Sequence, residues 1–366
     1  MKDMNERQSN IELLRLVCMF LVIWVHFSGH SIIVCSEEYA SQMGWEAIIP
    51  RLIRGLCWCA VNTFILISGY FSIRPKAKSF FNLYLVGAFY AGALYITHLY
   101  LTGSHLNRWV IYNTLMPFGL WKSSSDWWFI PNYLILYILS PLLNQVIDNI
   151  SKRKFQYFLL LQAIVVFYFG WYRNESWNGM GLNWINFIFI YFIGRYIAIY
   201  CKSSKCLSSK SGIYCVLWIS FGIIIGMIDW VTSAIKPFFS WMWFNGQYNN
   251  PLAIASAICL FMSFKSMNIK YNRVINWLAA SALPIYLVHN NNYIVAQSLY
   301  KYVTYIYDTH PTIIAYGMIF LISIALMICI PLFDKLRMLI TNPISKWLCD
   351  VYYRVKPCIL SFFNRM

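Results

Sequence analysis

The sequence predicts an all-α, polytopic membrane protein with about ten transmembrane helices and both termini in the cytoplasm. Hydrophobic residues make up 60% of the chain and charged residues only 11%, whereas a soluble domain carries about 25% charged residues. Long apolar runs recur along the chain, and Lys and Arg gather on one side of them. These three observations exclude a soluble enzyme, because no polar stretch is long enough to form a separate catalytic domain.

The apolar runs predict spans of about 15–25 residues, a length that crosses a hydrocarbon core of about 30 Å. The first run is too long for a signal peptide and lacks a small-residue cleavage site, so we expect it to remain as a helix. The segment 109–121 is interrupted by Pro117 and Gly119 and is predicted to lie at the outer surface or to re-enter the membrane. The predicted spans are 12–34, 52–72, 79–101, 128–148, 155–171, 184–200, 212–235, 250–264, 274–299 and 311–333.

The distribution of positive charge predicts the direction of these spans. With the N-terminus inside, 22 of the 29 Lys and Arg residues fall on the inner side, as the positive-inside rule requires. The net charge of +16 then follows from topology and needs no nucleic-acid partner. We expect one domain over residues 1–345 and a short basic cytoplasmic tail over residues 346–366.

The eleven cysteines are scattered, mostly in or beside the apolar runs. Cys57 and Cys59 have no second pair at metal-ligand spacing. We interpret them as small apolar side chains and predict no metal site.

The first span carries two ionisable side chains, Arg15 and His26, eleven positions apart. This spacing places them on one helical face, roughly 16 Å apart along the axis. An ionisable side chain within a membrane helix is a functional candidate, and a neutral histidine is the commonest general base near neutral pH. Two structural interpretations compete: His26 could hydrogen-bond a neighbouring helix, and Arg15 could be an interfacial anchor beside Glu12.

The second span ends in Ser-Gly-Tyr at 68–70 and is followed by Arg74, Lys76 and Lys78. The Ser-Gly pair allows helices to approach closely. The three basic residues would suit the phosphates of a cytoplasmic cofactor, with Arg favoured for bidentate contact. They are also what inner-side topology and lipid headgroups alone would produce.

Two later blocks add aromatic and amide side chains. The block 126–133 includes Trp128 and Tyr133 and could instead be an aromatic belt at the outer interface. In the ninth span His289 is followed by Asn290 and two more asparagines, which are costly unless they face a cavity or partner side chains. His289 lies about 24 Å along the helix from Arg273, so both histidines are predicted in the middle-to-outer half of the membrane. The aromatic segment 236–249 could contact a sugar or form an interface loop.

Together these four blocks resemble the membrane acyltransferase family 3, and 127–133, 136–144 and 285–290 are similar to its polysaccharide O-acetyltransferase branch. The resemblance covers about residues 8–335. It implies transfer of an acyl group, usually acetyl, from cytoplasmic acyl-CoA to a hydroxyl of a surface polysaccharide or its lipid-linked precursor, in the inner or plasma membrane. Acetyl-CoA would be a co-substrate, and no metal is implied.

The resemblance also implies roles for individual residues. His26 would be the catalytic base, Arg15 would hold the donor or orient its helix, and Arg74 would bind donor phosphates. Lys76 and Lys78 would assist Arg74. The expected partners are acyl-CoA, a carbohydrate or lipid-linked glycan acceptor, and membrane lipids.

Other groups and other functions stay open at this point. The candidates for contacting substrate or stabilising an oxyanion are Trp128, Tyr133, His289 and Asn290. A transporter or flippase for a glycan or another amphiphile would also place polar residues around a central cavity. A purely structural or regulatory membrane protein is disfavoured by the burial cost of His26 and His289.

Overall fold

A computed structural model of the chain describes residues 8–33, 45–108, 127–175, 180–201, 210–235, 247–291 and 295–363. Every regular element within these residues is helical, which confirms the all-α prediction. The predicted segment 109–121 lies outside the described residues, as do 236–246 of the aromatic segment. The elements are α1 (Ser9–Phe27), η1 (Ser28–Ile32), α3 (Trp45–Cys57), α4 (Ala60–Phe71), α5 (Ala77–Thr102), α7 (Phe129–Asp148), α8 (Lys152–Ala163), η2 (Ile164–Tyr172), α9 (Trp184–Tyr200), α10 (Ser211–Ile235), α11 (Pro251–Ser266), α12 (Arg273–Ala279), α13 (Ala282–His289), α14 (Val295–Thr309) and α15 (Thr312–Phe363).

Seven helical stretches of the described residues are long and apolar enough to cross a membrane. Two further apolar helices, α9 and α11, are shorter. Together they coincide with nine of the predicted spans. The count of ten spans and the cytoplasmic location of the termini stay predictions. The seven stretches are Ser9–Ile32, Ala47–Phe71, Ala77–Thr102, Phe129–Asp148, Lys152–Tyr172, Ser211–Ser233 and Thr312–Pro357.

The prediction of one continuous helix over 274–299 is wrong. The chain leaves the helix after Ala279, turns at Ala280 and Ser281, and resumes as α13. Pro284 explains part of this difference, because a proline fits the first turn of a new helix but not the middle of a long one. α13 ends at His289, and the polar residues Asn290 and Asn291 follow it outside the helix.

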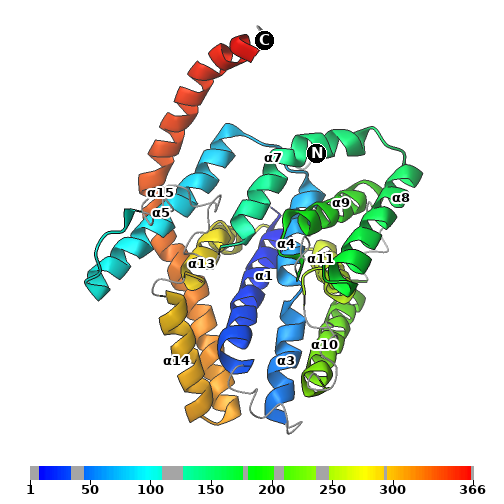
Figure 1. The fold of residues 1–366 in the computed structure, drawn as a ribbon, viewed down its shortest axis with the longest axis vertical. Coiled ribbons are helices and arrows are strands. Elements are labelled where there is room, and N and C mark those ends of the chain that lie inside the picture. Colours follow the sequence, from blue (N-terminus) through cyan, green and yellow to red (C-terminus); the bar gives the residue numbers. More distant parts are fainter. Residues whose placement is uncertain are drawn as a thin grey trace.

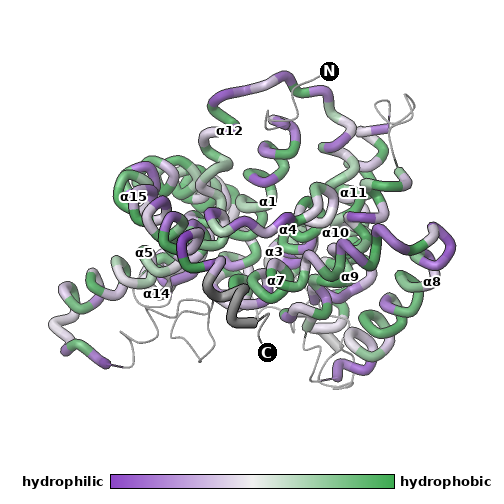
Figure 2. The backbone as a smooth tube through the Cα atoms, turned by 90° about the horizontal axis from the view of Figure 1, so that it is seen from above, coloured by the Kyte–Doolittle hydropathy of each residue, from purple (hydrophilic) through white to green (hydrophobic). Residues whose placement is uncertain are grey.

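The last predicted helix is also longer than expected. α15 runs for 52 residues and includes three prolines, and the residues 346–363 of the expected tail continue this helix. Figure 1 shows its red end extending beyond the other helices. Large apolar side chains on α15 are exposed, among them Ile313, Leu321 and Leu339, and Figure 2 shows hydrophobic residues on α15 and on other peripheral helices. Such a surface suits contact with lipid tails.

α1 forms the centre of the bundle. It contacts α3, α4, α11, α12, α13 and α15, and Figure 1 shows it between α13 and α4. Leu14, Cys18, Ile23 and Phe27 of α1 are fully buried. An apolar helix that is buried on most sides is typical of a bundle core.

Glycines allow two close helix crossings, as small residues do in membrane bundles. A methyl carbon added at Gly69 of α4 would collide with the carbonyl oxygen of Tyr191 in α9. One added at Gly194 would lie 2.6 Å from the carbonyl oxygen of Leu66. α3 and α10 cross in the same way, and the α10 glycines Gly222 and Gly226 are four residues apart. These crossings fix α4 and α3, which flank α1.

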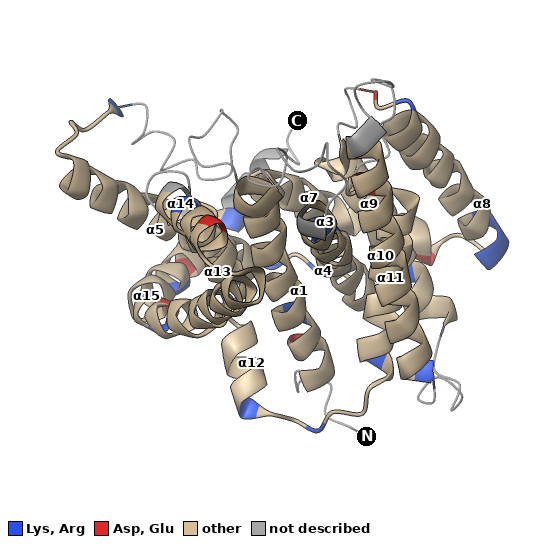
Figure 3. Cartoon of the chain, turned by 90° about the horizontal axis from the view of Figure 1, so that it is seen from below, with Lys and Arg blue, Asp and Glu red and all other residues tan. Residues whose placement is uncertain are grey.

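The bundle has two distinct ends. α1 begins and α15 ends toward the same end, and α3 begins at the opposite end (Figure 1). Figure 3 shows Lys and Arg, in blue, mostly near helix ends and in the segments between helices. Arg74, Lys76 and Lys78 lie at the junction of α4 and α5, whereas Arg51 and Arg54 lie in α3.

Candidate active site

The two predicted histidines meet although they are 263 residues apart in sequence. His26 near the end of α1 and His289 at the end of α13 place Nδ1 and Nε2 2.9 Å apart. His289 is fully buried, and its Nδ1 lies 2.6 Å from the carbonyl oxygen of Ile285. The structure therefore brings together one residue predicted as a base and one predicted to contact substrate.

These two hydrogen bonds decide the tautomers of the neutral pair. A carbonyl oxygen only accepts, so His289 Nδ1 carries a proton and donates it to Ile285. Neutral His289 Nε2 is then an acceptor, and His26 Nδ1–H donates to it. His26 Nε2 is left with its lone pair. This is the protonation state that a general base needs.

His26 lines a small cavity of about 100 Å³, which we call the His26 cavity. Its walls are mainly apolar and aromatic, as is usual for a small-molecule site. Trp128 lines this cavity, as does Tyr286. The other lining residues are Met19, Val22, Val61, Phe64, Phe129, Tyr248 and Leu283.

A second cavity of about 230 Å³ lies beside it and is lined by Arg15; we call it the Arg15 cavity. Ser68 and Tyr133 contribute hydroxyl groups to its wall, and these two oxygens lie 3.3 Å apart. Phe64, Phe129 and Leu283 line both cavities. The two cavities are therefore neighbours that share a wall of three apolar side chains. Together they extend from Arg15 to His26 along one face of α1.

The side chain of Arg15 can contact a ligand. Its side chain is 38% exposed, and its nearest carboxylate oxygen, on Glu12, lies 3.9 Å away. This separation is too long for a hydrogen bond. The predicted pairing with Glu12 is thus present but weak, and Arg15 also faces a cavity.

The basic residues after α4 lie in residues 72–78, a segment that we call the basic junction. Hydrogen bonds from other helices hold its backbone. Tyr137 of α7 accepts a hydrogen bond from the Lys76 amide at 2.8 Å. Asn144 donates to the Ile73 carbonyl, and the Ile73 amide donates to Tyr191. Arg74, Lys76 and Lys78 themselves are exposed and line neither cavity. The structure thus places them on the surface of a fixed segment.

Asn290 does not line either cavity. Its side-chain oxygen accepts a hydrogen bond from the Tyr300 hydroxyl at 3.1 Å. Among the four residues predicted to contact substrate, the structure therefore brings Trp128 and His289 to His26, places Tyr133 in the Arg15 cavity, and leaves Asn290 outside both cavities.

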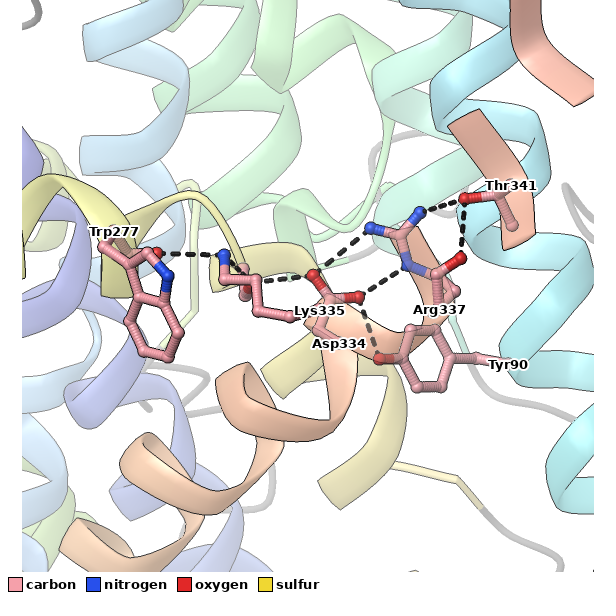
Figure 4. A network of polar contacts seen from close by, with 7 residues as sticks. Tyr90, Trp277, Asp334, Lys335, Arg337 and Thr341 are labelled. Carbon is pink, nitrogen blue, oxygen red and sulfur yellow. Dashed lines mark hydrogen bonds and ion pairs between the residues drawn. The ribbon is translucent and has the colours of Figure 1, made fainter. Parts of the chain in front are cut away.

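A buried polar network holds the broken helix that forms one wall of the Arg15 cavity (Figure 4). Asp334 is fully buried and accepts hydrogen bonds from Tyr90, Ser281 and Arg337, with Arg337 Nε at 2.6 Å. Ser281 stands between Ala280 and Ala282, which line the cavity. The network thus ties α5, the α12–α13 break and α15 to one carboxylate.

Sequence reasoning missed the two tyrosines of the His26 cavity, Tyr286 and Tyr248. Tyr286 precedes His289 by three positions, a spacing that places both on one helical face, and this signal could have identified it. Its hydroxyl is buried, close to Asn290 and Phe129, and makes no well-aligned hydrogen bond to the described residues. Tyr248 belongs to the aromatic segment 236–249, and its carbonyl accepts a hydrogen bond from Asn62. No local pattern singles Tyr248 out from its aromatic neighbours.

Within the described ranges no three His, Cys, Asp or Glu side chains are grouped so that they could hold a metal ion. Of the comparisons with known proteins, the one with family models found a match. No curated protein matches the chain, and no solved structure matches it. The family model described as an acyltransferase domain matches residues 8–332, a range that includes all of the residues lining both cavities. Because this match covers most of the chain, the protein belongs to the acyltransferase 3 family.

Proposed function

We propose that the protein is an integral membrane O-acyltransferase. It would move an acyl group, most simply acetyl, from cytoplasmic acyl-CoA to a hydroxyl of a surface polysaccharide or its lipid-linked precursor. One observation carries this proposal: His26, with a free lone pair on Nε2, lines a cavity that adjoins a second cavity lined by Arg15. The arrangement offers a base at one end of a passage and a positive charge at the other.

The donor fits this passage from the side of the basic junction. Arg74, with Lys76 and Lys78, would contact the donor's phosphates on the surface, because these cations are exposed on a held backbone. The uncharged arm of the donor would enter the Arg15 cavity and bring the thioester past Phe64 and Phe129 to His26. The exposed cations and the mainly apolar cavity match the charged and uncharged parts of such a donor.

The proposed reaction at His26 needs no reactant other than the acyl-CoA and the acceptor hydroxyl. The acceptor hydroxyl attacks the thioester carbonyl while His26 Nε2 takes the hydroxyl proton. The tetrahedral intermediate collapses, the C–S bond breaks, and His26 returns the proton to the CoA thiolate. The products are the acylated acceptor and free CoA thiol.

Two other groups would assist this step. His289 Nε2 accepts from His26 Nδ1–H and would stabilise the imidazolium that forms transiently, in the manner of the orienting group of a catalytic triad. The buried hydroxyl of Tyr286, which lines the His26 cavity, would donate to the oxyanion, a stabilisation that is strong in a site from which water is excluded. Trp128 would pack against the substrate.

Reconstituted vesicles provide the test of this function. The full chain is placed in liposomes with glycolipids from the cells that make it, and acetyl-CoA labelled in the acetyl group is supplied. The proposal predicts labelled glycan and release of one CoA per ester formed. Movement of glycan across the vesicle membrane without labelling would instead identify the transporter.

Replacement of His289 with alanine is expected to lower kcat by about 10²-fold, because His26 loses the group that fixes its ring and tautomer. The KM for acetyl-CoA should stay near that of the wild type, since His289 does not line either cavity. Initial rates over a series of acetyl-CoA concentrations separate the two parameters. Val288→Ala, on the same helix, serves as the control, and equal losses in both variants would contradict an orienting role for His289.

Replacement of Arg74 with alanine is expected to raise the KM for acetyl-CoA by about tenfold, the effect of one lost charge-assisted hydrogen bond. The kcat at saturating donor should change little, because Arg74 lies outside both cavities. Arg173→Ala, which removes another exposed arginine, is the matched control. An unchanged KM in Arg74→Ala would remove Arg74 from the donor site.

A further inference from the structure

Three charged side chains lie together in the membrane-spanning part of the bundle, away from the basic junction. Arg51 and Arg54 belong to α3, and Asp229 of α10 lies within electrostatic reach of both. Arg51 is 2% exposed and Asp229 is 7% exposed. Charged side chains within membrane helices are costly and are by default functional candidates.

Arg54 is the stronger electrostatic partner of Asp229, but the two side chains do not form a close ion pair. No carboxylate oxygen of the described residues lies within 4.0 Å of it. Its Nε is buried and has no hydrogen-bond partner among them. Its guanidinium stands over the ring of Trp58, 5.0 Å from the ring centroid, a cation–π contact that uses none of its hydrogen-bond donors. The side chain is only half-buried, so a ligand can reach it.

Two contacts relate Arg54 to the candidate active site. A methyl carbon added at Gly29 would lie 3.9 Å from an Nη of Arg54, and Gly29 follows His26 by three residues, about one helical turn. Trp58 packs against Tyr248 with ring centroids 5.0 Å apart, and Tyr248 lines the His26 cavity. The guanidinium therefore stands about one turn beyond His26, on the side away from Arg15.

From this geometry we infer that Arg54 binds an oxyanion carried by the acceptor, a sugar carboxylate or a phosphate, while a nearby acceptor hydroxyl reaches His26. The inference rests on the proposed acyl transfer and adds the class of acceptor. The planar guanidinium matches either oxyanion with two parallel hydrogen bonds. The oxyanion would supply the close counter-charge that Arg54 does not find among the described residues. The faces of Trp58 and Tyr248 offer apolar surface to the sugar ring between the two groups.

The test uses the full chain in liposomes with glycolipids from the cells that make it, separated by anion exchange into neutral and acidic fractions. The wild type should label the acidic fraction in preference to the neutral one. Arg54→Gln should lower kcat/KM for the acidic fraction by at least about tenfold. Arg54→Lys keeps the charge but not the planar fork, so its kcat/KM should lie between those of the wild type and Arg54→Gln. Arg173→Gln, a change at an exposed arginine outside the cluster, should resemble the wild type.

Chemical treatment of the acidic fraction distinguishes the two oxyanions. Coupling with a carbodiimide and an amine neutralises carboxylates and spares phosphates, so loss of labelling after coupling identifies a carboxylate and retention identifies a phosphate. Equal labelling of both untreated fractions by the wild type, or an unchanged kcat/KM in Arg54→Gln, overturns the inference about Arg54. A change that depends only on the anionic lipid content of the liposomes also overturns it. Absence of label from both fractions, with no CoA released, contradicts the proposed acyl transfer itself.

Discussion

Replacement of His26 with alanine should lower acyl transfer by about 10²- to 10⁴-fold, the range typical for loss of a general base. The variant keeps α1, whose other side chains pack the centre of the bundle, but the described lining of the His26 cavity then has no histidine. Membranes with equal amounts of wild type and variant are incubated with labelled acetyl-CoA, and label in glycan is counted. Binding of acetyl-CoA should be retained, since Arg15 and the basic junction are unchanged.

His310→Ala is the matched control for this experiment. His310 lies between α14 and α15, where its Nδ1 contacts the Thr309 hydroxyl, and it lines neither cavity. Its replacement should leave the rate near that of the wild type. Equal labelling by the His26 variant and the wild type would show that another group removes the acceptor proton.

Replacement of Asp334 with alanine should destabilise the fold by about 3–5 kcal/mol, the cost of leaving a buried partner charge uncompensated. The Arg337 side chain is only 7% exposed, and it would lose its carboxylate, while Tyr90 and Ser281 would lose their acceptor. A lower thermal unfolding midpoint of the purified protein measures this loss. Donor binding should weaken as well, because Ser281 stands between Ala280 and Ala282, which line the Arg15 cavity.

Two further variants make the Asp334 experiment specific. Asp350→Ala removes an exposed carboxylate from the same helix and should leave the unfolding midpoint nearly unchanged, as is usual for surface charges. The double variant Asp334→Leu/Arg337→Met removes both charges and should recover part of the lost stability, since apolar replacements of a buried ion pair are often neutral. A midpoint in Asp334→Ala equal to that of the wild type would contradict a structural role for the network.

Much of the fold could be predicted because a membrane imposes simple rules on the sequence. Apolar length identifies a helix when lipid is the solvent, and nine predicted spans coincide with apolar helices. The prediction failed at 274–299, where most residues of the first half are apolar. Hydropathy does not reveal a break in a helix when the backbone groups that the break frees face protein. Here the side chain of Ser281 is held by Asp334, 53 residues farther along the chain.

Part of the candidate site could also be predicted from the sequence, and part could not. Arg15 and His26 could be identified because both lie on one helix, where spacing determines the face. The contact between His26 and His289 could not, because hydropathy places a residue at a depth but does not say which helices are neighbours. The crossing at Gly69 and Gly194 shows what determines which helices pack together: small residues let two particular backbones approach closely. Such complementarity is a property of pairs of helices and is not visible in either helix alone.

The three side chains shared by the two cavities have a consequence for the cell as well as for the reaction. A protein that opens toward both faces of a membrane risks becoming a leak for protons and ions. Phe64, Phe129 and Leu283 stand where the two cavities adjoin, and apolar side chains at a constriction exclude a continuous thread of water. In the proposed reaction the acyl group passes these three side chains, which would also block a continuous path for protons and ions and so preserve the ion gradients of the membrane.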